Sequence, residues 1–162
     1  MAFQFNGVVP TSIVFNGVPL TELFFNGVQV WPSDTPQQNI GMFYGGYIPD
    51  NSDIVTRIDA SGVMVGSETT VGTARRGLAG ASVGGNGLFY GGYTTASSST
   101  VTRIDASGAI VGSQTSVGTS RQYPAGASVG GNGLFYGGLT SSSLNIVTRI
   151  DASGVMVGSQ TS

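Results

Sequence analysis

The sequence contains the stretch Gly87-Leu88-Phe89-Tyr90-Gly91-Gly92, which recurs almost letter for letter 46 residues earlier and 46 residues later, at 41–46 and 133–138. A second stretch, Val-Thr-Arg-Ile-Asp-Ala-Ser-Gly, has the same spacing and begins at Val55, Val101 and Val147. Self-similarity at a fixed period of this length is typical of repeat architectures, in which each copy folds as one small unit. The chain therefore divides into copies at 41–86, 87–132 and, in part, 133–162.

The second copy predicts four short antiparallel strands. Apolar and β-branched residues alternate with glycine or polar residues at 88–93, 100–104 and 109–115, and a strand of small residues follows at 125–129. The sequence Asp-Ala-Ser-Gly at 105–108 predicts a tight turn, because Asp bonds to the backbone ahead and Gly supplies a left-handed position. No stretch has a helical period. Four strands per copy are typical of a propeller blade.

Each copy resembles a kelch-type repeat, through the Gly pair after an aromatic strand and through an arginine, Arg75 or Arg121, in the long loop expected next. The resemblance implies four-stranded, kelch-like, propeller-type repeats, which are incomplete at the C-terminus. Together with the short β-hairpins expected in the N-terminal region, described next, it predicts an all-β fold. A propeller closes with roughly four to eight blades. We therefore expect either that the chain is the front part of a longer gene product or that neighbouring chains complete the structure.

The first 31 residues carry a second, shorter repeat. Three Phe-Asn-Gly-Val units, beginning at Phe5, Phe15 and Phe25, follow one another at a spacing of 10 residues. Asn-Gly between apolar residues is a strong signal for a tight hairpin, so we expect three hairpins. Strands this short are not stable alone, and apolar residues occupy both of their faces.

Two interpretations of these hairpins stay open. One is a small β-layer on the chain's own repeats. The other, which we favour, is an anchor at 1–31 that binds another copy or another protein, because a Pro-rich linker at 32–40 follows and separates it from the repeats at 41–162. The residues expected at this interface with another copy or another protein are Phe5, Phe15, Phe24, Phe25 and Trp31.

This N-terminal pattern, which closes on Val28-Gln29-Val30-Trp31, resembles the N-terminal segments of bacteriophage tail-fibre, neck and other virion appendage proteins. The resemblance implies an N-terminus that docks to tail or neck proteins and a β-rich part that projects and contacts the host surface. It also implies a location in the virion and an assembly that is often a trimer, and the two apolar faces of the hairpins independently favour a homo-oligomer. The N-terminus has no basic region followed by a continuous apolar run, so we expect synthesis in the host cytoplasm without a signal peptide. No catalytic residues come with it, so we expect a structural protein and not an enzyme.

The composition argues against several kinds of chemistry. The net charge is −2 and 9% of residues are charged, compared with the usual quarter, so we expect neither nucleic-acid binding nor membrane insertion. Cys and His are absent, which removes disulfides, thiolate or imidazole metal sites and Ser-His or Cys-His nucleophiles. We expect no cofactor and no metal, and a solvated rather than calcium-binding loop at 50–53. Repeated pairs such as Arg57 and Asp59 are expected to form a structural ion-pair ladder between copies.

The copies differ from one another mainly in two places: the segment after the Gly pair, as at 47–53 and 93–99, and the segment at 74–78 or 120–124. In an antiparallel meander, loops after the first and third strands emerge at the same end, so we expect the variable segments to share one surface. That surface is either a binding face or an unconstrained solvent side. The candidate surface-binding residues are Tyr47, Asp50, Asn51, Arg75, Arg76, Tyr93, Gln122 and Tyr123.

Tyrosines among Ser and Thr form an amphipathic, weakly charged surface of the kind that stacks on sugars. The alternative function is therefore a carbohydrate-binding β-propeller lectin, with a host-surface glycan as its ligand. A glycan-degrading enzyme is less well supported, because no pair of acidic residues suited to general acid and base roles repeats along the chain.

Overall fold

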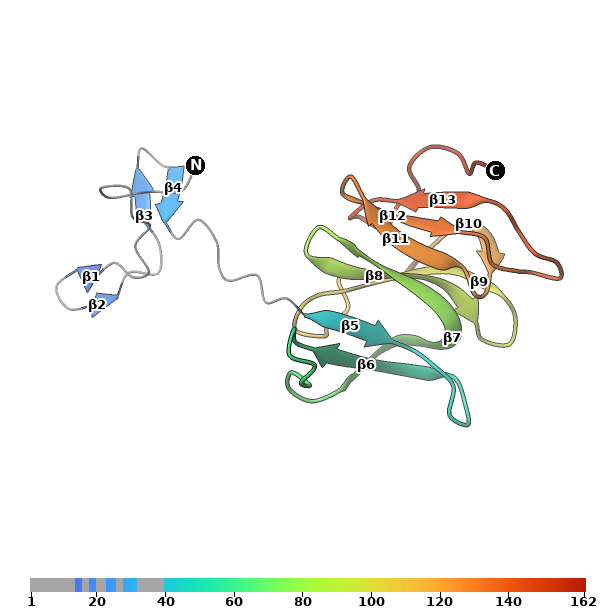
Figure 1. The fold of residues 1–162 in the computed structure, drawn as a ribbon, viewed down its shortest axis with the longest axis horizontal. Coiled ribbons are helices and arrows are strands. Elements are labelled where there is room, and N and C mark those ends of the chain that lie inside the picture. Colours follow the sequence, from blue (N-terminus) through green and yellow to red (C-terminus); the bar gives the residue numbers. More distant parts are fainter. Residues whose placement is uncertain (1–13, 16–17, 20–22, 26–27, 32–39) are drawn as a thin grey trace. The chain divides into compact units, whose positions relative to one another are not determined.

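The computed structural model describes residues 14–15, 18–19, 23–25, 28–31 and 40–162. The chain divides into two units, residues 1–38 and 39–162. All secondary structure in the described residues is β (Figure 1), which confirms the all-β class. The repeats do not form a closed propeller in this structure. The structure therefore shows the expected all-β class but not the expected propeller.

In the N-terminal unit, the residues that the structure describes form two hairpins. β1 (Val14–Phe15) pairs with β2 (Val18–Pro19), and β3 (Leu23–Phe25) pairs with β4 (Val28–Trp31), both antiparallel. Each hairpin flanks an Asn-Gly pair, in agreement with the sequence signal. Of the residues expected at the interface, Phe15 lies in β1, Phe24 and Phe25 lie in β3, and Trp31 lies in β4. Phe5, with the first expected hairpin, lies outside the described residues.

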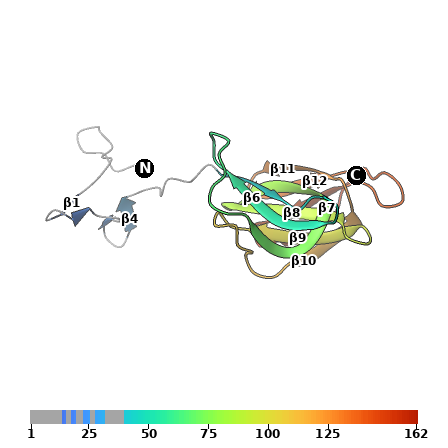
Figure 2. The same cartoon turned by 90° about the horizontal axis from the view of Figure 1, so that it is seen from below.

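The repeat unit consists of two antiparallel sheets, one of six strands in the order β10-β9-β8-β7-β6-β5 and one of three in the order β11-β12-β13. Seen from below, β11 and β12 run along one side of the unit and β9 and β10 along the other (Figure 2). The strands are β5 (Gly41–Tyr44), β6 (Ser52–Ile58), β7 (Thr69–Val83), β8 (Asn86–Tyr93), β9 (Ser98–Ile104), β10 (Thr115–Arg121), β11 (Ala125–Val129), β12 (Asn132–Tyr136) and β13 (Val147–Ile150).

The long strand β7 crosses from one repeat to the next. Its residues 69–75 pair with β6, whereas residues 76–83 pair with β8 (Figure 1). One repeat later the equivalent segment is split into β10 and β11, with Pro124 between them. Proline has no backbone N–H to donate to a ladder, which accounts for the break. The repeat unit is therefore three layers of strands, with a crossing after the first and after the second layer.

The sequence placed the third strand of the second copy wrongly. We expected a strand at 109–115 and a loop at 117–124, but the strand is β10 (Thr115–Arg121). Between β9 and β10 the chain makes a single bridge, from Ile110 to Ile104. Gly112 then adopts φ +66°, a left-handed conformation that ends regular pairing. The fourth strand was predicted correctly at 125–129.

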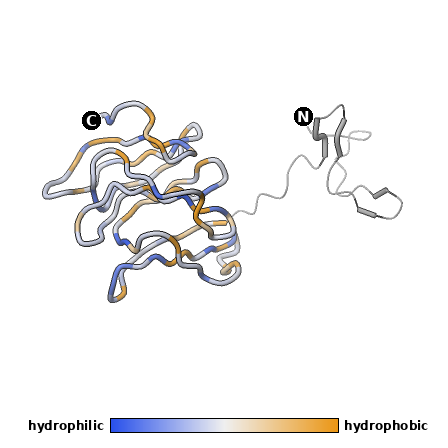
Figure 3. Tube along the Cα trace, turned by 180° about the vertical axis from the view of Figure 1, so that it is seen from behind, coloured by the Kyte–Doolittle hydropathy of each residue, from blue (hydrophilic) through white to orange (hydrophobic). Residues whose placement is uncertain are grey.

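The layers pack on one another through the aromatic pair of the recurring stretch. The ring of Tyr44 lies 5.4 Å from that of Phe89, and Tyr90 lies 5.1 Å from Phe135. In each pair the tyrosine belongs to one layer and the phenylalanine to the next. Short apolar segments are accordingly spread along the whole repeat unit (Figure 3). Offset or tilted ring contacts of this kind add to the stabilisation from burial.

Two buried arginines hold the crossings in place. Arg75 is fully buried and donates to the carbonyl oxygens of Gly91 (2.6 Å) and Thr100 (2.8 Å) in the following layer. Arg121 occupies the equivalent place and donates to the carbonyl oxygen of Phe135 at 3.0 Å. Arg75 was expected on an exposed binding loop, and that prediction is wrong, because it lies inside strand β7 with its side chain directed into the core.

The expected ion-pair ladder is replaced by bonds to the backbone. Arg57 does reach the following copy, but it donates to the carbonyl oxygen of Ala106 at 3.3 Å. Arg103 repeats this contact with Ala152, also at 3.3 Å. The Asp59 carboxylate instead accepts the N–H groups of Ser61 and Val63 in its own turn. The aspartates stabilise the turns, and the arginines join each layer to the next.

Candidate binding surface

The structure brings the two variable segments of the first copy to the same end of the repeat unit. Arg76, in β7, is paired with Tyr93 across the ladder to β8. Its guanidinium carbon lies 4.6 Å from the ring centre of Tyr47 and 4.5 Å from that of Tyr93. Both distances are within the range of a cation–π interaction. We call Tyr47, Asn51, Arg76 and Tyr93 the Arg76 cluster.

Asn51 connects the cluster to the neighbouring loop. Its side-chain oxygen accepts a hydrogen bond from Nη1 of Arg76 at 3.2 Å, and its amide nitrogen donates to the carbonyl oxygen of Thr94 at 3.0 Å. Residues from the first and second copies are thereby held together. Because Arg76 is fixed on two sides by rings and on a third by an amide, its guanidinium is positioned before any ligand arrives, which lowers the entropic cost of binding.

The second copy carries a different set of side chains at the equivalent positions. Gln122 takes the place of Arg76, and its backbone pairs with Leu139. Tyr123 is exposed, has φ +55° and donates its backbone N–H to the carbonyl oxygen of Gly77 at 2.6 Å. Among the described residues it is the one non-glycine with positive φ, a conformation that costs free energy for a bulky side chain. Its ring lies against Gly77.

The predicted candidate residues therefore separate into four groups. Tyr47, Asn51, Arg76 and Tyr93 form the cluster; Asp50 is exposed on its 47–51 loop, and Gln122 and Tyr123 follow one repeat away. Arg75 belongs to the core. That one arginine bridges two copies was not predicted from the sequence. The signal was present, since Tyr47 and Tyr93 are 46 residues apart and hence occupy the same position in neighbouring layers.

The side chains of the Arg76 cluster are of the kinds that recognise a ligand. Aromatic rings, a guanidinium and an amide supply stacking faces and hydrogen-bond donors, which suit hydroxyl-rich or anionic groups. Asp50 lies on the adjoining loop and Asp53 lies at the start of β6. In the described part of the chain no group of three or more acidic side chains is placed to hold a metal ion.

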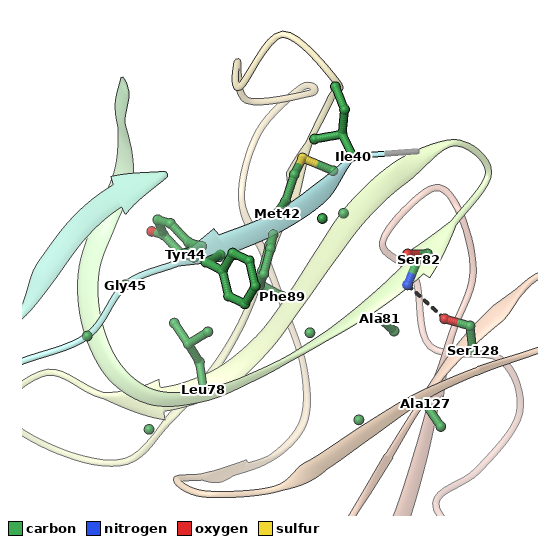
Figure 4. Close-up of a pocket in the computed structure, with 17 residues that line it drawn as sticks. Ile40, Met42, Tyr44, Gly45, Leu78, Ala81, Ser82, Phe89, Ala127 and Ser128 are labelled. Carbon is green, nitrogen blue, oxygen red and sulfur yellow. Dashed lines mark hydrogen bonds between the residues drawn. The ribbon is translucent and has the colours of Figure 1, made fainter. Parts of the chain in front are cut away.

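A cleft of about 700 Å³ lies between β5, β7 and β11 (Figure 4). Met42 and Phe89 line one side of it, and Ala81 and Ser128 line the other. The Ser128 hydroxyl accepts the backbone N–H of Ser82 at 2.7 Å. Tyr44 is the one titratable side chain among the lining residues, so the cleft has no acid and base pair.

The position of the cleft explains its shape. It borders the free edge of β5, whereas the equivalent edge of β8 is covered by β7 and that of β12 by β11. In the second layer, a fourth strand occupies the place that is equivalent to this cleft. We assign it a structural origin rather than a catalytic role.

The fold and this surface define an all-β repeat protein with one chemically distinct end. No protein-family model matches the chain, and no curated protein sequence matches it. The described residues contain no helix with the length and apolarity needed to cross a membrane.

Proposed function

We propose that this protein is a structural component of a virion appendage, with an N-terminal unit that docks to tail or neck proteins and a repeat unit that displays the Arg76 cluster toward the host surface. The proposal rests first on the resemblance of the Phe-Asn-Gly-Val repeats to such N-termini. In this assignment the protein is not an enzyme, and it assembles as a homo-oligomer.

One structural observation supports the displayed surface. The residues that repeat between copies make the contacts that hold the layers together, such as the bonds from Arg57 to Ala106 and from Arg103 to Ala152. Asn51 and Arg76, which are replaced by Ser97 and Gln122 one repeat later, belong instead to the Arg76 cluster. A constant scaffold that carries changing side chains at one end is typical of a binding surface.

The virion assignment is tested on particles. Mass spectrometry of virions purified from a culture that expresses the gene is expected to detect the chain at a fixed stoichiometry to the tail proteins. Antibodies against residues 40–162 are expected to label the outside of the particle in electron micrographs. A chain that stays in the soluble fraction and is absent from purified particles would rule out the appendage role.

A second candidate function, carbohydrate binding, is favoured by the geometry of Tyr47, Arg76 and Tyr93. A sugar ring stacks on the exposed Tyr47 ring, and the guanidinium of Arg76 donates to its hydroxyls. On a glycan array, the full chain is expected to bind a limited set of glycans, and Arg76→Ala is expected to lose that binding. Gln122→Ala is the matched control, because Gln122 occupies the same place one repeat later without the arginine. Equal loss in both variants would argue against a site at Arg76.

A further inference from the structure

Successive layers of the repeat unit use the same contact twice. Tyr44 packs on Phe89, and Tyr90 packs on Phe135 one repeat later. The hydroxyl of Thr69 donates to the carbonyl oxygen of Gly108 at 2.8 Å, and Thr115 does the same to Gly154 at 2.8 Å. We call the side of a layer that carries the tyrosine its forward face, and the side that carries the phenylalanine its backward face.

Within residues 40–162, the first and the last layer each carry the same residues on a face that no other layer covers. Tyr136, on the forward face of the last layer, is 54% exposed, whereas its equivalent Tyr90 is fully buried. Phe43, on the backward face of the first layer, is 60% exposed, whereas its equivalent Phe89 is 5% exposed. The two open faces are therefore the two halves of a contact that the chain makes twice internally.

The polar groups on these faces match in the same way. Arg149 is the equivalent of Arg57 and Arg103, and it is exposed. The carbonyl oxygens that those two arginines bind belong to Ala106 and Ala152, in Asp-Ala-Ser-Gly turns. The first copy has the same turn, in which Ala60 is exposed. One open face thus carries the donor, and the other carries the acceptor.

We propose that two copies of this chain associate head to tail, with the forward face of the last layer in one copy against the backward face of the first layer in the next. Tyr136 then packs on Phe43, and Arg149 donates to the carbonyl oxygen of Ala60. A second copy is the occupant that the observations favour, because it supplies the residues of an interface already present within each chain. Such a contact is heterologous, so it generates a closed ring or an open filament.

The interface is tested by site-specific cross-linking of the full chain, which has no cysteine of its own. Differently tagged Phe43→Cys and Tyr136→Cys variants are mixed and treated with a short bismaleimide. We expect the mixed product to exceed, several-fold, the product of either variant alone. This readout is independent of the proposed virion role, and it reports on the repeat unit even if the N-terminal unit also associates.

The matched control is a mixture of Phe43→Cys and Tyr123→Cys, because Tyr123 is as exposed as Tyr136 but lies on another surface. Both Phe43 and Tyr136 are exposed in the single chain, so their substitution leaves the fold intact, and thermal unfolding of each variant checks this. A double variant, Phe43→Cys with Tyr136→Cys, is expected to give a ladder if a filament forms and a single closed species if a ring forms. A mixed product no greater than that of the control mixture overturns the proposal.

Discussion

The guanidinium of Arg75 donates a hydrogen bond to the hydroxyl oxygen of Thr102, which lies 27 residues further along the chain and in the next layer of the repeat unit. The same bond joins Arg121 to Thr148 one repeat later, at 2.6 Å. Among the described residues no carboxylate holds either arginine; carbonyl and hydroxyl oxygens and a tyrosine ring surround each of them. Burial lowers the pKa of Arg75 from its usual value, and the neighbouring Tyr44 acts in the opposite direction.

Replacing the threonine tests how much this bond stabilises the fold. Thr102→Val keeps the volume of the side chain but removes the acceptor, so a buried, charged donor loses a partner. The loss of a hydrogen bond to a charged group costs about 1.5–3 kcal/mol, and we expect a decrease of that size in the free energy of unfolding, measured by urea denaturation. In Thr56→Val, the matched control, the lost bond runs to Glu68 at an exposed site, and the expected cost is below about 1 kcal/mol. Equal costs in the two variants would contradict a special role for Arg75.

The Arg76 cluster also contributes to stability. In Arg76→Ala the guanidinium leaves the rings of Tyr47 and Tyr93, and each cation–π contact at an exposed site stabilises by about 0.5–1 kcal/mol. We expect a loss of about 1–2 kcal/mol in total, visible as a lower midpoint of thermal unfolding. Gln122→Ala, one repeat away, is expected to change the midpoint little. A larger loss in the glutamine variant would show that the rings do not hold the arginine.

Arg75 and Arg76 illustrate what the sequence could predict. The position of Arg75 is also an arginine in the second copy, Arg121, whereas the position of Arg76 is a glutamine there, Gln122. A residue kept between copies is one that the repeated core contacts require, and a residue that changes is free to face outward. Applied to Arg75, that comparison would have placed it in the core, but its position beside variable residues and its charge favoured a loop.

The strand boundaries show a second limit of sequence reasoning. The strand at Ala125–Val129, predicted from its run of small residues, was predicted correctly. The segment 109–115 has the alternation of a strand, yet Gly112 turns the chain away from the ladder. Glycine occurs both in strands and in left-handed turns, so its presence in the sequence does not distinguish the two. The packing of Arg103 beside Gly112 is a tertiary contact that no local pattern reveals.

Close approach of two strands makes another glycine essential. A Cβ atom added at Gly126 would overlap the carbonyl oxygen of Gly80 in β7, so Gly126→Ala forces β11 away from β7. Overpacking of this kind costs about 1–3 kcal/mol, and we expect a loss in that range by urea denaturation. Gly41→Ala is the control, because the atoms nearest to its added Cβ are 3.7 Å away. A Gly126 variant as stable as the Gly41 variant would mean that β11 and β7 are not in contact.

The repeated turns predict a dependence of stability on pH. Hydrogen bonds from the Ser107 hydroxyl, and then from backbone N–H groups including that of Ala109, outweigh burial and lower the pKa of Asp105 below the usual value of 3.8. A carboxyl group whose pKa is depressed in the folded state stabilises the fold at pH values above its unfolded pKa, and that contribution is lost as the pH falls through its folded pKa. In Asp105→Asn we therefore expect lower stability than wild type at pH 7, by less than about 1 kcal/mol because solvent screens this partly exposed group. Urea denaturation at pH 7 and near pH 2 is the measurement, and the difference between the two proteins is expected to shrink at the lower pH. A difference that is constant across this range would show that the turn is held by the shape of the side chain and not by its charge.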